Sequence, residues 1–117
     1  MFWKSPQNDK NFYWTRHIKE KMKYYRISEG RLRRILKSPF RREKGIARGT
    51  IAVMQPARTK KPSEIWLMYQ ERNKRKIMIS AWRYPGISPV GEPIPVPEDI
   101  IKELKKDRKI FLTKKKK

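Results

Sequence analysis

Two short apolar runs joined by a charged turn dominate the hydrophobic pattern of the chain. The runs cover residues 64–70 and 76–82, and the segment 71–75 between them is polar and turn-like. Each run is too short for an independent helix and is rich in the β-branched and aromatic residues that pack well on a pleated surface. The pattern therefore predicts a β-hairpin. Because both of its faces are apolar, we expect a central pair of strands that is covered on both sides.

The two-residue period of a strand divides the side chains of the hairpin between two faces. In the first arm, one face is predicted to carry Ile65, Leu67 and Tyr69, and the other Trp66 and Met68. In the second arm, the predicted sets are Ile77, Ile79 and Ala81 on one face and Met78, Ser80 and Trp82 on the other.

Two weaker extended segments precede the hairpin. Residues 40–46 and 50–55 flank a break at Arg48-Gly49, and a basic loop over residues 56–63, which holds two prolines, leads into the hairpin. Four successive strands with short connections predict an antiparallel meander. The first of these strands is mostly charged, and we expect it at an edge of the sheet.

Helical periodicity is found on the N-terminal side of these strands. Thr15 is a good N-cap for a helix over residues 16–25, and Ser28 is a good N-cap for a second helix that runs to about residue 37. Pro39 ends the second helix, because the residue before a proline avoids helical geometry. The apolar stripes of both helices are best explained as core packing.

The C-terminal part begins with a proline-rich connector, which should run extended over the surface. Glu98 and Asp99 then start a third helix, with the acidic first turn that the helix dipole favours. The segments that we expect are an N-terminal arm, an α+β core, the connector, the helix with an apolar patch, and a lysine tail, over residues 1–13, 14–86, 87–97, 98–112 and 113–117.

A chain of 117 residues is long enough for one hydrophobic core but not for two. The elements above therefore predict a single α+β domain. In it, two N-terminal helices pack on a four-stranded antiparallel meander, and a C-terminal helix is added to this core.

The charge of the chain points to a partner. The sequence has 32 Lys and Arg residues against 11 Asp and Glu, which gives a formal net charge of +21. Because such an excess repels itself in a compact state, it is best understood as a surface that matches a polyanion. We expect a nucleic acid, with RNA favoured over DNA. An acidic protein partner, or a basic surface without a specific polyanion, is the alternative. We expect no membrane association, because no strongly amphipathic basic helix stands out.

A scarcity of reactive side chains excludes several classes of site. The chain has no cysteine, which excludes a disulfide framework, a thiolate nucleophile and a cysteine-built zinc site. With His17 as the single histidine, a histidine-rich metal site is excluded too, and we expect no cofactor. No apolar stretch has the length of a signal peptide or of a membrane span, so a cytoplasmic location is expected.

Basic residues fall at both ends of the predicted sheet, because the connections of a meander alternate between its ends. One predicted cluster combines guanidinium groups, which can bind phosphate bidentately, with aromatic rings that either stack on an unpaired base or simply pack. Its members are Arg41, Arg42, Arg58, Lys60, Lys61, Trp82, Arg83 and Tyr84. The opposite cluster is explained equally well by phosphate contact and by protection of a hairpin tip against aggregation. Its members are Arg48, Arg72, Lys74, Arg75 and Lys76.

His17 is the one side chain whose unperturbed pKa lies near neutrality, and it is therefore the one ready general base. A single histidine in the first turn of a helix more often has a structural role or is merely exposed. The helix dipole disfavours its protonated form there, which suits a neutral base and a hydrogen-bonding residue alike. The sequence supports no Ser/His/Asp arrangement, phosphate-binding glycine loop or carboxylate pair.

Several of these residues form a family pattern. The pattern consists of His17, Met22, Arg26-Ile27-Ser28, an apolar stripe that ends before Pro39, a glycine-bearing strand, and three further strands that end in Ala81-Trp82-Arg83-Tyr84. Over residues 14–86 the chain resembles small domains related to the RelE/ParE toxin superfamily, and in particular an uncharacterised branch whose first helix begins with a histidine. The resemblance implies two N-terminal helices on one face of a twisted, four-stranded antiparallel sheet.

The resemblance also implies a metal-independent endoribonuclease that acts on free or ribosome-bound RNA through attack of a ribose 2′-hydroxyl on the next phosphate. His17 and Tyr84 would then transfer protons, and Lys21, Arg26 and Arg83 would stabilise the phosphate. A non-catalytic nucleic-acid- or ribosome-binding accessory protein is one alternative, and a module for an acidic, antitoxin-like protein is another. The oligomeric state is left open. So is the question of whether the third helix or an RNA base covers the sheet face predicted to hold Trp66, Met68, Met78 and Trp82.

Overall fold

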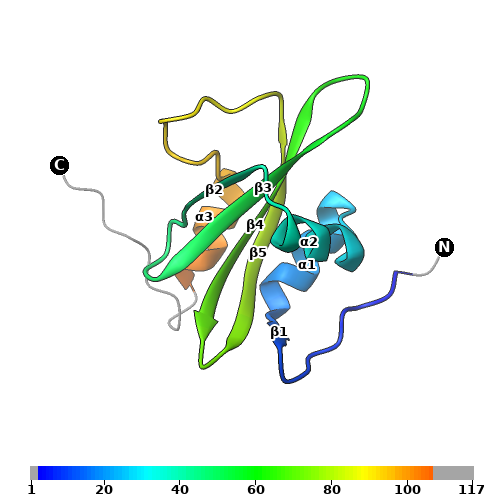
Figure 1. The fold of residues 1–117 in the computed structure, drawn as a ribbon, viewed down its shortest axis with the longest axis vertical. Helices are drawn as coiled ribbons and strands as arrows, with labels where there is room; N and C mark the ends of the chain where they lie inside the picture. Colours follow the sequence, from blue (N-terminus) through cyan, green and yellow to red (C-terminus); the bar gives the residue numbers. More distant parts are fainter. Residues whose placement is uncertain (1–2, 107–117) are drawn as a thin grey trace.

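A five-stranded mixed sheet forms the centre of the computed structural model, which describes residues 3–106 (Figure 1). The strands stand in the order β1-β5-β4-β3-β2 across the sheet. The elements are β1 (Phe12–Trp14), α1 (Arg16–Tyr25), α2 (Glu29–Lys37), β2 (Arg41–Lys44), β3 (Thr50–Ala57), β4 (Ser63–Arg72), β5 (Arg75–Pro85) and α3 (Glu98–Lys106). The predicted α+β class is confirmed. The expected apolar patch at residues 110–112 and the lysine tail lie outside the described residues.

The predicted hairpin is the pair β4 and β5, and each of the consecutive pairs from β2 to β5 is antiparallel, as the meander requires. The prediction of a four-stranded, fully antiparallel sheet is wrong in one detail. Phe12, Tyr13 and Trp14 form a fifth strand, β1, that pairs in parallel with Lys76, Ile77 and Met78 of β5. A three-residue strand has no measurable period, and its partner lies far along the chain, so local pattern could not reveal it.

Both faces of the sheet are covered, as the apolar character of the hairpin predicts. One core lies under the N-terminal helices and contains Ile18, Met22, Leu32, Ile35, Val53, Ile65, Leu67 and Tyr69. The second core lies under α3 and contains Ala52, Met54, Trp66, Met68, Ile79, Trp82, Ile100 and Leu104. Trp66 and Trp82 are cross-strand partners, and their rings stack at 6.1 Å between centroids. The sequence did not decide whether α3 or an RNA base covers the face of Trp66 and Trp82, and in the structure α3 covers it.

A β-bulge in β5 changes which side chains share a face. Met68 pairs with Ser80 and Tyr69 pairs with Met78, so Ile79 is the extra residue. The bulge shifts the phase of the strand by one residue. The predicted sets for the second arm are therefore wrong: Met78 and Ala81 lie in the core of the N-terminal helices, whereas Ile79 and Trp82 lie under α3.

Local capping chemistry sets where the helices begin. Thr15 Oγ1 accepts a hydrogen bond from the backbone nitrogen of Ile18, and Ser28 Oγ accepts one from that of Arg31. The bounds of α1 and α2 therefore agree with the prediction. The Thr15 hydroxyl also lies 3.1 and 3.0 Å from the carbonyl oxygens of Met78 and Ile79, which ties the start of α1 to the bulge.

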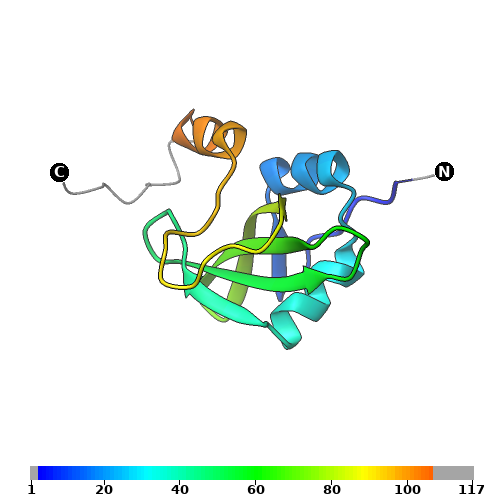
Figure 2. The same ribbon diagram turned by 90° about the horizontal axis from the view of Figure 1, so that it is seen from above.

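The helices are arranged differently from the expected pair on one face. Figure 2 shows α2 and α3 on opposite sides of the sheet. α1 packs against β5, with Ile18 and Met22 in the core shared with α2, while His17 and Lys21 on its other side contact α3. α1 thus contacts both layers. None of the three described helices has the length and apolarity needed to cross a membrane.

Two glycines offer a matched test of the packing. A Cβ on Gly45 would lie 2.8 Å from Thr50 Cβ and 3.0 Å from Met68 Cγ, whereas a Cβ on Gly30 in α2 would meet nothing within 4 Å. Gly45→Ala should lower the free energy of unfolding by about 1–3 kcal/mol through overpacking. Gly30→Ala should raise it by about 0.5 kcal/mol through backbone entropy. Urea unfolding measures both changes, and equal effects of the two substitutions would contradict the packing described.

Candidate functional site

The basic residues predicted at one end of the sheet do share that end. Arg41 begins β2, the loop with Arg58, Lys60 and Lys61 joins β3 to β4, and the pairing of Ser63 with Pro85 brings the end of β5 beside this loop. Arg42, Arg58, Lys60 and Lys61 are exposed. None of these four forms an ion pair with any residue between 3 and 106.

Arg41 and Trp82, by contrast, are part of the interior. The Arg41 side chain is 9% exposed, binds the carboxylate of Glu43 at 2.9 Å and donates to Ser88 Oγ at 2.7 Å. Its guanidinium also lies over the ring of Trp66, 5.2 Å from the centroid. Trp82 is fully buried under α3. Both residues therefore hold the fold together and are not available to a nucleic acid.

A buried carboxylate fixes the connector beside this end of the sheet. Glu64 is 3% exposed and accepts hydrogen bonds from the hydroxyl and backbone nitrogen of Ser88 at 2.6 and 3.0 Å, and from the indole nitrogen of Trp66 at 3.1 Å. These donors compensate the desolvation of the carboxylate. This role of Glu64 was not predicted, because a single glutamate at the start of a strand forms no recognisable sequence pattern.

A groove lies between the C-terminal end of α2 and strand β3. Its volume is about 580 Å³, and it is lined by Arg31, Ser38, Pro39, Phe40, Gln55, Pro56 and Arg58. Phe40 is 70% exposed, so a large apolar side chain lies open to solvent in the lining of the groove. No acidic residue belongs to this lining. The groove was not predicted, although an aromatic residue directly after Ser38-Pro39 was visible in the sequence.

Positive charge accumulates around Arg31 without compensation. Its Nη2 donates to the carbonyl oxygen of Pro56 at 3.0 Å, while its Nε is buried and has no partner in the described part of the chain. Burial lowers the pKa of Arg31, and the neighbouring charges of Arg34 and Arg83 lower it further. The two charged side chains that shift this pKa, Arg34 and Arg83, are thus both cations.

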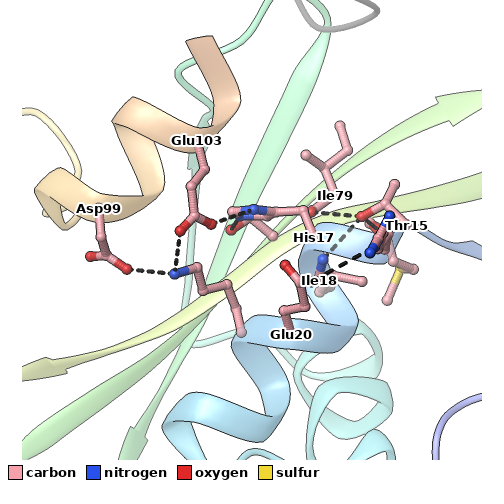
Figure 3. A network of polar contacts seen from close by, with 11 residues as sticks. Thr15, His17, Ile18, Glu20, Ile79, Asp99 and Glu103 are labelled. Carbon is pink, nitrogen blue, oxygen red and sulfur yellow. Dashed lines mark hydrogen bonds and ion pairs between the residues drawn. The ribbon is translucent and has the colours of Figure 1, made fainter. Parts of the chain in front are cut away.

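His17 belongs to a separate polar network between α1, β5 and α3 (Figure 3). Its Nδ1 lies 3.1 Å from Glu103 Oε1, and its Nε2 lies 2.8 Å from Ser80 Oγ. Burial lowers the pKa of His17 below 6.5; the Glu103 carboxylate opposes this shift, and the Lys21 ammonium adds to it. The connectivity is that of a Ser-His-acid triad, but Ser80 is fully buried, so its hydroxyl is not accessible to a substrate.

Lys21, predicted to contact a phosphate, instead binds the carboxylates of α3. Its Nζ lies 2.7 Å from Asp99 Oδ2 and 3.0 Å from Glu103 Oε2, and the residue is 7% exposed. Burial works against the charged form of Lys21, but the hydrogen bonds that its ammonium donates to Asp99 and Glu103 outweigh this effect, and the pKa of Lys21 is raised overall. The network therefore fastens α3 to α1. Among the described residues, no group of three or more acidic or histidine side chains could hold a metal ion.

The other residues of the predicted catalytic site do not converge on His17. Arg83 Nη2 donates to the carbonyl oxygens of Tyr25 and Arg26 at the end of α1, at 3.2 and 3.4 Å, and Arg26 itself is exposed. Tyr84 packs against the core under α3. It follows Ser80 by four residues on β5, which places it roughly 13 Å along the strand from the His17 contact. One phosphate cannot meet both His17 and Tyr84 in this arrangement.

The second predicted cluster lies at the far end of the sheet. Arg48, Arg72 and Lys74 are exposed around the β4–β5 turn. Arg75 is engaged, because it donates to the carbonyl oxygen of Asp9 and lies over the ring of Tyr13. Its three exposed cations, Arg48, Arg72 and Lys74, equal in charge the three of the β3–β4 loop, Arg58, Lys60 and Lys61.

The burial of His17 makes stability depend on pH. Because the pKa of His17 is lower in the folded chain than its ordinary value of 6.5, the unfolded chain binds more protons below pH 6.5. The free energy of unfolding should therefore fall as the pH is lowered from about 7 towards 5. His17→Gln should flatten this dependence, which urea titrations at several pH values will measure. If the free energy of unfolding of His17→Gln depends on pH as steeply as that of the wild type, groups other than His17 cause the dependence.

Comparison with known proteins places the chain in no family. No protein-family model, curated protein or solved structure matches it. The resemblance of residues 14–86 to RelE/ParE domains therefore rests on the residue pattern alone, and its consequences for function are proposals.

Proposed function

We propose that the chain binds RNA, without cleaving it, through a basic face formed by α2 and the β3–β4 loop. We define this basic face by the residues Arg31, Arg34, Arg58, Lys60 and Lys61. The observation that carries the proposal is that none of these five cations forms an ion pair within residues 3–106. A phosphate backbone supplies the missing counter-charge and releases its own counterions on binding.

The distribution of acidic residues supports the proposal. Glu20 and Glu29 pair with arginines on their own helices, Glu43 pairs with Arg41, and Asp99 and Glu103 bind Lys21 and His17. Glu64 is buried on Ser88. These carboxylates are thus engaged away from the basic face. RNA is favoured over DNA because of the resemblance to RelE/ParE domains.

Cleavage of RNA has less support than binding. The resemblance implies proton transfer by His17 and Tyr84, yet His17 is held between Ser80 and Glu103 under α3, and Tyr84 lies farther along β5. A non-catalytic RNA- or ribosome-binding protein is therefore the function that we favour.

The basic face can be tested with two variants of equal charge. Replacing Arg58, Lys60 and Lys61 by Gln should weaken binding of a fluorescent single-stranded RNA by roughly tenfold or more at low salt, because three phosphate contacts are lost. The slope of log affinity against log salt should become shallower by about 2. The control replaces Arg48, Arg72 and Lys74 by Gln at the far end of the sheet. Equal weakening by both triple variants would show that net charge alone drives binding.

Catalysis can be tested separately on the intact chain. Incubation with RNA, with and without ribosomes, should leave the RNA uncut while fluorescence anisotropy reports binding. Electrophoresis of end-labelled RNA will detect any defined cleavage. Cleavage that disappears in both His17→Ala and Tyr84→Ala would contradict the non-catalytic proposal and support the endoribonuclease.

A further inference from the structure

The groove between α2 and β3 has the dimensions of a small-ligand site within the basic face. Its volume of about 580 Å³ lies within the range of roughly 300–1,000 Å³ that is typical of ligand pockets. A double helix cannot enter a hollow of this size, but one nucleotide of a single strand can. The lining combines an aromatic ring, two arginines and the uncharged polar side chains of Ser38 and Gln55.

We propose that this groove receives one unpaired nucleotide of an RNA strand, with its base stacked on Phe40 and its phosphate bound by Arg31 and Arg58. The inference rests on the proposed RNA binding and adds to it the class of substrate: single-stranded or looped RNA rather than a duplex. The basic face attracts RNA phosphates whether or not the bases are paired. The groove would add a preference for RNA with an unpaired base.

Phe40 is suited to stacking because its backbone is fixed while its ring is exposed. The backbone nitrogen of Phe40 donates to the carbonyl oxygen of Met54 at 2.8 Å, which joins the residue to β3 just before β2 begins. Pro39 restricts the chain on the other side. The ring, 70% exposed, is therefore presented to solvent from a rigid support. Base–aromatic stacking on such a platform tolerates every base, because each base has a π-face.

Arg31 is suited to a phosphate because part of its guanidinium is already oriented. One terminal nitrogen is held by the carbonyl oxygen of Pro56 at 3.0 Å, and the buried Nε has no partner among the described residues. A guanidinium offers a planar set of donors that matches phosphate oxygens. Burial and the charges of Arg34 and Arg83 lower the pKa of Arg31, so an anion in the groove would relieve an existing repulsion.

The bases of duplex RNA are stacked on one another, and a ring such as Phe40 cannot reach their faces. Proteins that recognise RNA sequence or single strands instead stack splayed bases on aromatic side chains. A second highly exposed aromatic side chain, Tyr24 on α1, is 73% exposed but packs edge-on against Tyr25 at 4.8 Å, and Lys21 lies over its ring. Tyr24 therefore provides a matched control outside the groove.

The test compares Phe40→Ala, Phe40→Tyr and Tyr24→Ala in the full chain, with fluorescein-labelled oligouridylate and an RNA duplex of equal length as probes. Phe40→Ala should weaken oligouridylate binding about 5- to 100-fold, which is the effect of one stacked base. Its affinity for the duplex should stay within about twofold of wild type, since only phosphate contacts serve the duplex. Phe40→Tyr should retain binding to both probes, and Tyr24→Ala should bind both as wild type does.

Thermal unfolding of each variant will show that the fold is retained, as expected for substitutions of highly exposed side chains. Oligouridylate binding could be unchanged in Phe40→Ala but weakened by the triple substitution of Arg58, Lys60 and Lys61. This result would contradict nucleotide binding in the groove and still support RNA binding by the basic face. Equal weakening for oligouridylate and duplex would also overturn it. A wild-type chain that binds neither probe would overturn the proposed function, and the groove with it.

Discussion

A strand whose side chains are apolar in both directions has to be covered on both faces, and β4 and β5 are strands of this kind. Neither the N-terminal helices nor α3 alone could bury Leu67 on one face and Trp66 on the other. Burying a large apolar side chain contributes about 1.5–3 kcal/mol, so an uncovered face would cost several times that amount. The double-sided hairpin therefore requires two helical layers, and the remaining elements follow from this requirement.

Fastening the second layer uses the few acidic residues of the chain. Glu64 binds the connector through Ser88, and Asp99 and Glu103 bind Lys21 and His17 on α1. These contacts lie on the α3 side of the sheet, where acidic side chains are paired with Lys21, His17 and Ser88. No carboxylate lines the groove, and the β3–β4 loop contains no acidic residue. The charge is thus unevenly distributed: Glu64, Asp99 and Glu103 stabilise the α3 layer, whereas the cations of the basic face form no ion pair within residues 3–106.

The predictions succeeded where chemistry is local. The N-caps Thr15 and Ser28 and the acidic first turn at Glu98 determine their helices through neighbours a few residues away. The predictions failed where the structure of a residue depends on contacts with residues far away in the sequence. Phe12–Trp14 became a strand only through β5, and Arg41 is buried only because Trp66 and Ser88 meet it. The alternation of side chains along β5 shifts by one residue at the Ile79 bulge, and a strict two-residue period cannot predict such a shift.

α1 packs against both helical layers. Ile18 and Met22 belong to the core shared with α2, Lys21 contacts α3, and Tyr25 packs against both cores. Two cores that share a helix cannot lose their packing independently, because loosening either one exposes side chains of the other. The domain is therefore expected to unfold as one cooperative unit, and hydrogen exchange should report the same opening free energy for the amides of β4 and β5.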